Sequence, residues 1–312
     1  MNKYSQRIVF MGTPSFASNI LSGLIDAGFN IVGAVCQPDA IVGRKKQLKA
    51  SEVKQTCNLL NVPVFTPEKI RNDYQDILSL NPDLIVTAAY GQIIPKALLD
   101  APKYGCINAH GSLLPKYRGG SPIQRALIDG ESKTGISIMY MNEKMDEGDI
   151  IVQKEIDIDI HDTNTTLFNK LSDLALNMLV EAIPAIFDGN INAHSQDHSV
   201  ATYAPNLDKQ IEHIFFNEDV LKVYNHIRGL LDNPGCYFVI NDKRYRIESA
   251  FFEYDKNVNT NTFIGLENDY LRIDCIDGYI KIYQIKPEGK NSMDAKAFYN
   301  GTGRSLVGEK LG

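Results

Sequence analysis

The chain has 312 residues, a length typical of two domains or of one large α/β domain with an appendage. Its 44% hydrophobic and 22% charged residues exclude a disordered, collagen-like or coiled-coil protein. The 32 basic residues against 38 acidic ones give a net charge of −6, so no global basic field marks a nucleic-acid-binding protein.

The cysteines and the lengths of the apolar runs indicate the cellular compartment in which the protein is expected. The five cysteines form no CxxC pair, and the first residues are polar rather than like a secretory leader. Apolar runs such as residues 84–90 are far shorter than the roughly 20 residues that cross a bilayer. We therefore expect a cytoplasmic protein without a membrane span.

The first third of the chain alternates short β-branched runs with segments of helical periodicity. This alternation is typical of βαβ units in a parallel sheet, and continuous apolar strands fit a sheet covered on both faces. We expect strands at residues 7–12, 31–36 and 84–89, and helices at residues 16–28, 51–60 and 68–80.

The middle of the chain continues this pattern but contains a long loop. A short strand at 106–108 breaks into a Gly- and Pro-rich loop that runs to residue 122. Beyond it we expect helices at 123–128 and 165–187, and strands at 135–141 and 150–155 that flank the acidic turn MNEKMDEGD. Pro184 is expected to kink the long helix or to end it early.

The remainder of the chain indicates a second domain. Residues 188–208 are polar and aperiodic, as in a linker. A helix at 219–231 is followed by expected strands at 236–240, 245–248, 262–265, 270–274 and 278–285. The predicted fold is a Rossmann-like, mostly parallel α/β sheet domain at 1–189, a linker at 190–207, and a small C-terminal β-barrel domain, oligonucleotide-binding-like as one option, at 208–312.

Three polar residues form the strongest candidate for chemistry. Asn108 and His110 stand two apart at a strand end, so their side chains project in the same direction. Asp146, in a second glycine-containing loop, would orient or charge the imidazole. On residue types alone, the same positions also fit a turn cap, a half-buried histidine and an acidic hairpin turn.

The strings around these residues settle the choice by resemblance. NAHGSLLP at 108–115 and YRGGSPI at 117–123 closely resemble the core of the folate-dependent formyltransferases, and MDEGD at 145–149 resembles the loop that supplies their catalytic aspartate. Further matches are FMGTP at 10–14, QPD at 37–39 followed by GRKK at 43–46, AYG at 89–91 and QIKPEGKNSM at 284–293. The resemblance covers nearly the whole chain and is best to the members that act on methionyl-tRNA.

The resemblance implies an activity. The formyl group of 10-formyltetrahydrofolate would pass to the α-amino group of methionyl initiator tRNA, giving formylmethionyl-tRNA for translation initiation. In such a transfer, negative charge develops on the former carbonyl oxygen of a tetrahedral intermediate, and hydrogen-bond donors must meet it. Asn108 and His110 would be those catalytic donors, while catalytic Asp146 would favour the protonated imidazole and help to move protons.

The resemblance also implies where the folate co-substrate and the tRNA bind. The folate contacts would be Ser112, Leu113, Leu114, Pro115, Tyr90, Gly91 and Ile93, although a surface loop and a core strand end are the plain alternatives. The tRNA contacts would be Arg44, Lys45, Lys46 and Lys49 in a basic loop at 40–50, and Lys243, Arg244, Arg246, Lys281, Lys286 and Lys290 in the C-terminal domain. A basic run is also compatible with a merely solvated face.

Two departures from the family and several rival functions remain open. Ala40, Ile41 and Val42 stand where an Arg-Pro pair is expected after QPD, and HIFF at 213–216 replaces a segment that commonly carries an acid and a Trp. The rivals are an enzyme that formylates an amino sugar or nucleotide, and a catalytically silent RNA-binding protein. His194 and His198 have zinc-like spacing but no Glu between them, so no metal is expected, nor a membrane or DNA partner.

Overall fold

The computed structural model describes residues 3–42 and 47–312, and the chain divides into two compact units. The first unit runs to Pro122 and also contains Thr134–Ile156 and Phe168–Pro205. The second contains Ile123–Lys133, Asp157–Leu167 and Asn206–Gly312. The segments Ile123–Lys133 and Asp157–Leu167 thus group with the C-terminal unit. The predicted domains, by contrast, are continuous ranges of the chain, and their boundaries stay a prediction.

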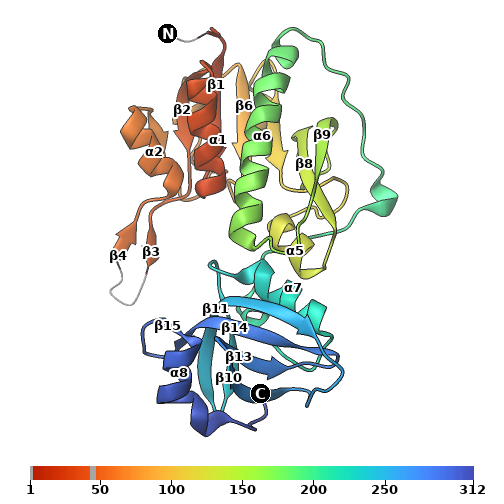
Figure 1. Ribbon diagram of the computed structural model, residues 1–312. Helices are drawn as coiled ribbons and strands as arrows, with labels where there is room; N and C mark the ends of the chain where they lie inside the picture. The colour runs from red at the N-terminus through yellow and green to blue at the C-terminus, as the bar shows by residue number, and fades with distance from the viewer. Residues whose placement is uncertain (1–2, 43–46) are drawn as a thin grey trace. The chain divides into compact units, whose positions relative to one another are not determined.

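The first unit is built on a seven-stranded sheet with the order β5-β2-β1-β6-β7-β8-β9 (Figure 1). Its strands are β1 (Arg7–Gly12), β2 (Asn30–Val35), β5 (Val64–Phe65), β6 (Leu84–Ala88), β7 (Cys106–His110), β8 (Lys133–Tyr140) and β9 (Ile150–Asp157). The pairings from β5 to β7 are parallel, and β8 runs antiparallel to β7. Every residue of β6 is buried, as expected for a strand covered on both faces. The predicted mostly parallel α/β sheet is confirmed.

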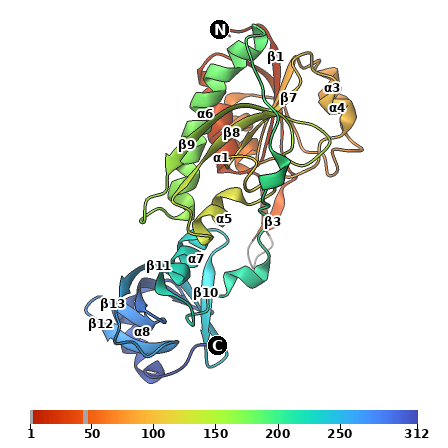
Figure 2. The same ribbon diagram turned by 90° about the vertical axis from the view of Figure 1, so that its right-hand side faces the viewer.

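Helices cover both faces of this sheet. Figures 1 and 2 show α1 (Ser15–Asp26) and α6 (Asn164–Phe187) on one face and α3 (Gln75–Ser79) and α4 (Lys96–Leu99) on the other. α1 and α6 pack closely at Gly23, where an added Cβ atom would overlap the Leu176 side chain. A further helix, α2 (Glu52–Leu60), is capped by Ser51, whose hydroxyl accepts a hydrogen bond from the Lys54 amide.

The structure differs from the local expectations in this unit at three places. The helix expected at 68–80 is limited to α3, since the chain before it forms a separate turn in which the Asn72 and Asp73 amides donate to the Lys69 carbonyl oxygen. Pro184 lies inside α6, which continues to Phe187. The expected basic loop at 40–50 contains a two-stranded antiparallel sheet of β3 (Ala40–Val42) and β4 (Gln47–Lys49).

The second unit is built on an antiparallel sheet with the order β10-β11-β14-β13-β12, and β15 pairs with β14. Its elements are β10 (Cys236–Ile240), β11 (Lys243–Tyr254), β12 (Thr262–Glu267), β13 (Tyr270–Asp274), β14 (Gly278–Pro287), β15 (Met293–Asp294), α5 (Pro122–Ile128), α7 (Val220–Leu230) and α8 (Ala295–Gly301). The backbone amides of Gly312 and Leu311 donate to Val239 on β10 and to Asn261 beside β12, so the C-terminal residues bridge the two edge strands. This closure makes the sheet barrel-like. The sequence analysis missed α8, whose Phe298 is buried in the core of the unit.

Candidate active site

Two adjacent parallel strands place Asn108 at the carboxyl edge of the sheet. Thr87 on β6 and Asn108 on β7 are register partners. The Thr87 hydroxyl donates to Asn108 Oδ1 at 2.8 Å, which fixes the orientation of the half-buried amide. No partner for Asn108 Nδ2 is found among the residues that the structure describes. The amide hydrogens are therefore available to an oxygen of a bound molecule.

His110 ends the same strand, and only 5% of it is exposed. Its Nε2 lies 2.9 Å from the Tyr117 carbonyl oxygen. Because a carbonyl oxygen only accepts, Nε2 carries a hydrogen, and Nδ1 is left for other chemistry. Nδ1 lies 3.7 Å from Asp146 Oδ1, a distance that allows charge attraction but exceeds a normal hydrogen bond. Asn108, His110 and Asp146 all belong to the first unit, and this contact joins the last two.

A tight loop between β8 and β9 presents Asp146. Its backbone has a φ of +53°, in the left-handed region, and its Oδ2 accepts a hydrogen bond from the Gly119 amide at 2.8 Å. A Cβ atom at Gly148 would overlap the Tyr140 carbonyl oxygen, so this position requires glycine. With Oδ2 held by Gly119, Oδ1 is the oxygen of Asp146 that faces His110.

A buried polar network, which the sequence analysis missed, supports that loop. Arg118 is 1% exposed, and its Nη2 donates to Gln196 Oε1 at 2.7 Å. Arg118 Nη1 also pairs with Glu147 at 3.2 Å. In turn, Gln196 Nε2 donates to the backbone oxygens of Asp146 and Gly148, each at 2.8 Å. Arg118 and Gln196 therefore fix the backbone on which Asp146 stands.

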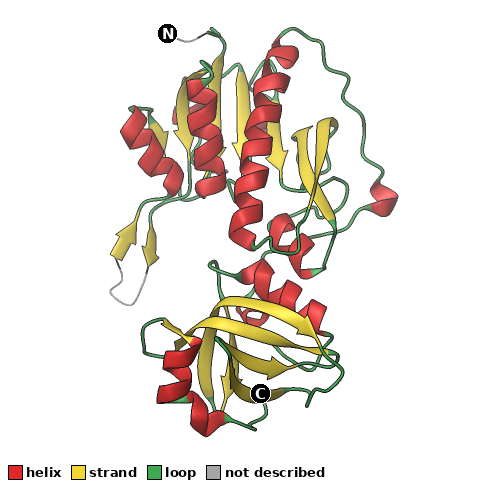
Figure 3. Ribbon diagram, in the orientation of Figure 1, coloured by secondary structure: helices red, strands yellow, loops and turns green. Residues whose placement is uncertain are grey.

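Gln196 comes from the segment predicted as linker. Figure 3 shows the stretch after α6 as a loop interrupted by a short helical turn, His198–Val200. Within it, His194 pairs with Ile150, and Ala204 accepts a hydrogen bond from the Ser121 amide. No periodic signal in the sequence marks Gln196, whereas its partner Arg118 lies in the family-like string YRGG at 117–120.

The loop after His110 is held by its own contacts and by β8 and β9. Ser112 is 1% exposed, and its hydroxyl donates to the Lys116 carbonyl oxygen at 2.6 Å. Leu114 is buried, and its carbonyl oxygen accepts from Gln153 Nε2 at 2.8 Å. The side chains of Ser112 and Leu114 are thus used within the protein. The carbonyl oxygens of residues 112–115 all accept hydrogen bonds within the protein, and the Leu114 amide donates one to Ser137. Among the described residues, the half-buried side chains of Leu113 and Pro115 and the amides of Ser112 and Leu113 are the groups left for a ligand.

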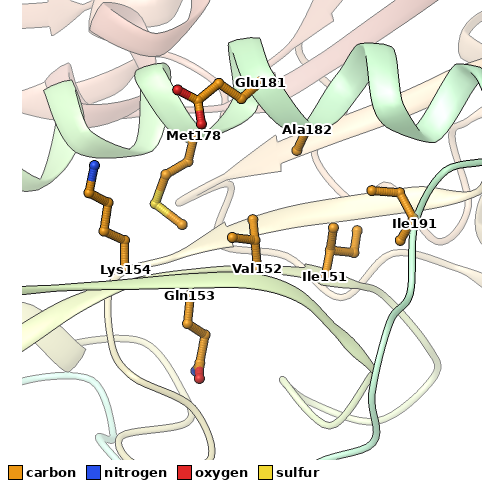
Figure 4. A pocket seen from close by; sticks show the side chains of 8 residues that line it. All are labelled: Ile151, Val152, Gln153, Lys154, Met178, Glu181, Ala182 and Ile191. Carbon is orange, nitrogen blue, oxygen red and sulfur yellow. The ribbon is translucent and has the colours of Figure 1, made fainter.

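Figure 4 shows how β9 divides its side chains. Gln153 points away from α6, whereas Val152 and Lys154 point toward it. A cavity of about 250 Å³ beside α6 is lined by Ile151, Val152, Gln153, Lys154, Met178, Glu181, Ala182 and Ile191. None of the predicted site residues lines this cavity, so it is separate from the Asn108 and His110 constellation.

The predicted folate contacts after β6 differ in exposure. Tyr90 is buried against Val9 and Met11, and its hydroxyl has no hydrogen-bond partner within residues 3–42 and 47–312. Burial raises the pKa of this phenol. Gly91 is exposed with a φ of +88°, and Ile93 is 77% exposed. The Tyr90 side chain thus lies in the core, while Gly91 and Ile93 lie at the surface.

The predicted tRNA contacts fall into three groups. Arg44, Lys45 and Lys46 lie outside the described residues. Lys49 forms an exposed ion pair with Glu52 at 3.0 Å. In the second unit, Lys243, Arg244, Lys286 and Lys290 are exposed, whereas half-buried Arg246 donates to the Asp232 carbonyl and half-buried Lys281 pairs with Glu253.

In the part of the chain that the structure describes, no three His, Cys, Asp or Glu side chains gather in a way that would hold a metal ion. No helix in residues 3–42 and 47–312 combines the length and apolar character needed to cross a membrane.

Comparison with solved structures supports the fold. The sugar 3N-formyl transferase WlaRD, solved in the presence of dTDP and 5-N-formyl-THF, is 20% identical, with a TM-score of 0.67 over 92% of this chain and 100% of that one. HypX from Aquifex aeolicus, solved in complex with tetrahydrofolic acid, is 14% identical, with a TM-score of 0.69 over 97% of this chain and 48% of that one. At these identities the likeness concerns the fold alone.

Comparison by sequence identifies the family. Residues 6–183 match the formyl transferase family, and residues 206–303 match the formyl transferase C-terminal domain. The methionyl-tRNA formyltransferase of Bacillus licheniformis is 43% identical over 310 residues, covering 98% of both chains. That of Halalkalibacterium halodurans is 44% identical over 311 residues, again 98% of both. The chain therefore belongs to the formyl transferase family, among the methionyl-tRNA formyltransferases.

Proposed function

We propose that the protein transfers the formyl group of 10-formyltetrahydrofolate to the α-amino group of methionyl initiator tRNA, for use in translation initiation. The full-length relatives, identical at 40–44% of positions, are methionyl-tRNA formyltransferases. The observation that carries the proposal is the constellation at the carboxyl end of β7. There, Asn108 Nδ2 has no partner among the described residues, and His110 Nδ1 faces the Asp146 carboxylate.

Asn108 and His110 supply hydrogen-bond donors for the reaction. When bound, 10-formyltetrahydrofolate supplies a formyl group on N10 whose oxygen gains negative charge during transfer. Asn108 Nδ2 donates to this oxygen, since Oδ1 is already engaged by Thr87. His110 donates through Nδ1–H in its protonated form, because its Nε2–H is engaged by the Tyr117 carbonyl.

Asp146 balances the charge and the protons of the transfer. The amine nitrogen forms a bond to the formyl carbon and loses a proton, while the bond from that carbon to N10 breaks and N10 gains a proton. Asp146 Oδ1, at 3.7 Å from His110 Nδ1, compensates the imidazolium charge and receives the amine proton before it passes to the leaving nitrogen. The protein needs no covalent intermediate of its own.

The residues around the constellation fit a folate. One donor there, Asn108 Nδ2, lacks a partner among the described residues. Leu113 and Ile93 offer apolar contact, and the amides of Ser112 and Leu113 and the backbone at Gly91 offer polar contact. We assign these residues to folate binding on the strength of the family resemblance.

The tRNA contacts are inferred from the exposed positive charges, and the cellular compartment is inferred from the state of the cysteine thiols. Exposed Lys49, Lys243, Arg244, Lys286 and Lys290 would bind phosphates, together with the basic residues at 44–46. All five cysteines are buried and unpaired, which agrees with a cytoplasmic location.

A comparison of acceptors tests the function. The purified protein is given 10-formyltetrahydrofolate with charged initiator tRNA, with free methionine, or with an amino-sugar nucleotide, and the formylated products are measured. We expect efficient formylation of methionyl-tRNA and little of the small amines. Preferred formylation of the amino sugar would favour the rival substrate, and no transfer to any amine would contradict enzymatic function.

A further inference from the structure

The second unit contains a hollow that is independent of the catalytic constellation. This cavity, of about 480 Å³, is lined by the rings of His213, Phe215 and Tyr237 and by the cations Lys209 and Arg244, with Gln210 and Glu212 also in its wall. All of these residues belong to the second unit, whereas Asn108, His110 and Asp146 belong to the first.

Two of the three rings are stacked, and the Phe215 ring is tilted by 41° to that of His213. The His213 and Tyr237 rings are nearly parallel, with centroids 5.2 Å apart and an angle of 8°. The Phe215 ring lies 4.3 Å from that of His213. The Arg244 guanidinium lies over the Tyr237 ring at 4.7 Å, a cation–π contact. Aromatic and guanidinium groups are thus already assembled side by side.

The Phe215 side chain lies outside the hydrophobic core of the unit and is exposed to solvent. It is 53% exposed, while its neighbour Phe216 is fully buried and packs against Phe238. Phe216 therefore packs in the hydrophobic core, whereas the Phe215 ring is in contact with water. An exposed phenyl ring beside two stacked rings and two cations is a typical feature of a binding surface.

The backbone holds this surface rigidly. His213 pairs with Tyr237 on β10, and the Ile214 amide donates to the Tyr237 carbonyl oxygen at 2.8 Å. His213 Nε2 donates to the Gly312 carbonyl oxygen at 2.8 Å. A site that is ordered before its ligand arrives loses less entropy on binding.

We propose that His213, Phe215 and Tyr237 form a stacking site for an unpaired base of the tRNA, with Lys209 and Arg244 as cations for the adjoining phosphates. Every base has a π face, whereas the phosphates require positive charge, and this cavity supplies both. The proposal rests on the proposed function, because it names a contact with the same substrate.

Equilibrium binding of tRNA tests the site. Phe215→Ala should raise the Kd by about 5- to 140-fold, the range expected for the loss of one stacked base. Its salt dependence should stay parental because Phe215 is uncharged, whereas Arg244→Gln should flatten that dependence. Tyr254→Ala is the matched control, since Tyr254 is 59% exposed in the same unit but does not line the cavity. Its Kd should stay parental.

A second measurement separates this proposal from the function itself. A single-stranded RNA hexamer carrying 2-aminopurine should lose fluorescence when its base stacks on the parent protein, and Phe215→Ala should abolish this quenching. If the parent formylates methionyl-tRNA but Phe215→Ala and Tyr237→Ala bind tRNA and quench the hexamer as the parent does, the stacking site is wrong and the function stands. If the parent fails to formylate but Phe215→Ala abolishes quenching, the nucleic-acid site stands and the proposed function falls.

Discussion

The Thr87 hydroxyl donates to Asn108 Oδ1 at 2.8 Å across two adjacent parallel strands. A side-chain amide can rotate and exchange its oxygen and nitrogen, so a donor to Oδ1 decides where the amide hydrogens point. Thr87 is 3% exposed and belongs to a fully buried strand. We therefore regard Thr87 as a positioning residue for Asn108.

Replacement of Thr87 tests this role. Thr87→Val keeps the shape and removes the hydroxyl, so kcat should fall by about 5- to 15-fold, the value of one net hydrogen bond of about 1–1.5 kcal/mol. KM for methionyl-tRNA should change little. Thr87→Ser, which retains the hydroxyl, should recover most of the loss in steady-state kinetics. Equal loss in both variants would mean that packing, rather than the hydrogen bond, matters at this position.

Gln196 offers a second test, of the network beneath Asp146. Gln196→Leu removes the acceptor of buried Arg118 and both donors to the loop backbone. We expect the free energy of unfolding to fall by about 1–3 kcal/mol and kcat to fall more than the affinity for tRNA. Urea denaturation and steady-state kinetics measure the two effects. Gln75→Leu, at an exposed position, is the control and should leave both unchanged.

More of the fold than of the hydrogen bonds that support the site could be predicted from the sequence. The alternation of β-branched and helical segments indicated the sheet, and the period of two along β7 placed Asn108 and His110 on one side. Arg118 and Gln196 are 78 residues apart, and Gln196 stands in a polar, aperiodic segment. Such a contact leaves no local signal, because it depends on how a loop folds back onto the domain.

The basic loop gives a third prediction. Replacing Arg44, Lys45 and Lys46 together with Gln should weaken tRNA binding and lower the log–log salt slope by up to about 0.7 per lost phosphate contact. Folate binding should remain parental, as should any measurable reaction with small amines. If the triple variant keeps the parental tRNA affinity and salt slope, recognition must come from the C-terminal unit instead.

His226 predicts a pH dependence of stability. Burial lowers its pKa, and the Arg125 charge adds to this, although the 2.7 Å hydrogen bond from Nε2 to the Ile211 carbonyl opposes it. The unfolded imidazole gains a proton near pH 6.5 that the folded one resists. The stabilisation is therefore present above this pH and is lost as pH falls below it, by at most about 1.4 kcal/mol per unit.

Urea denaturation between pH 7.5 and pH 5.5 measures this effect. His226→Gln keeps a donor for the Ile211 carbonyl but cannot titrate, so it should lose less stability than the parent across the interval. An identical pH dependence in the two proteins would show that His226 is not responsible.

The rate of formyl transfer to methionyl initiator tRNA by Asn108→Ala, measured beside the parent with 10-formyltetrahydrofolate as donor, tests the proposed catalysis most directly. Asn108 would supply one of two donors to the oxygen that gains charge, and the loss of such a donor lowers kcat by about 100- to 1000-fold. We predict a loss of this size for Asn108→Ala, with tRNA and folate binding close to parental. A variant that transferred formyl within a few-fold of the parental rate would contradict the assignment of this site.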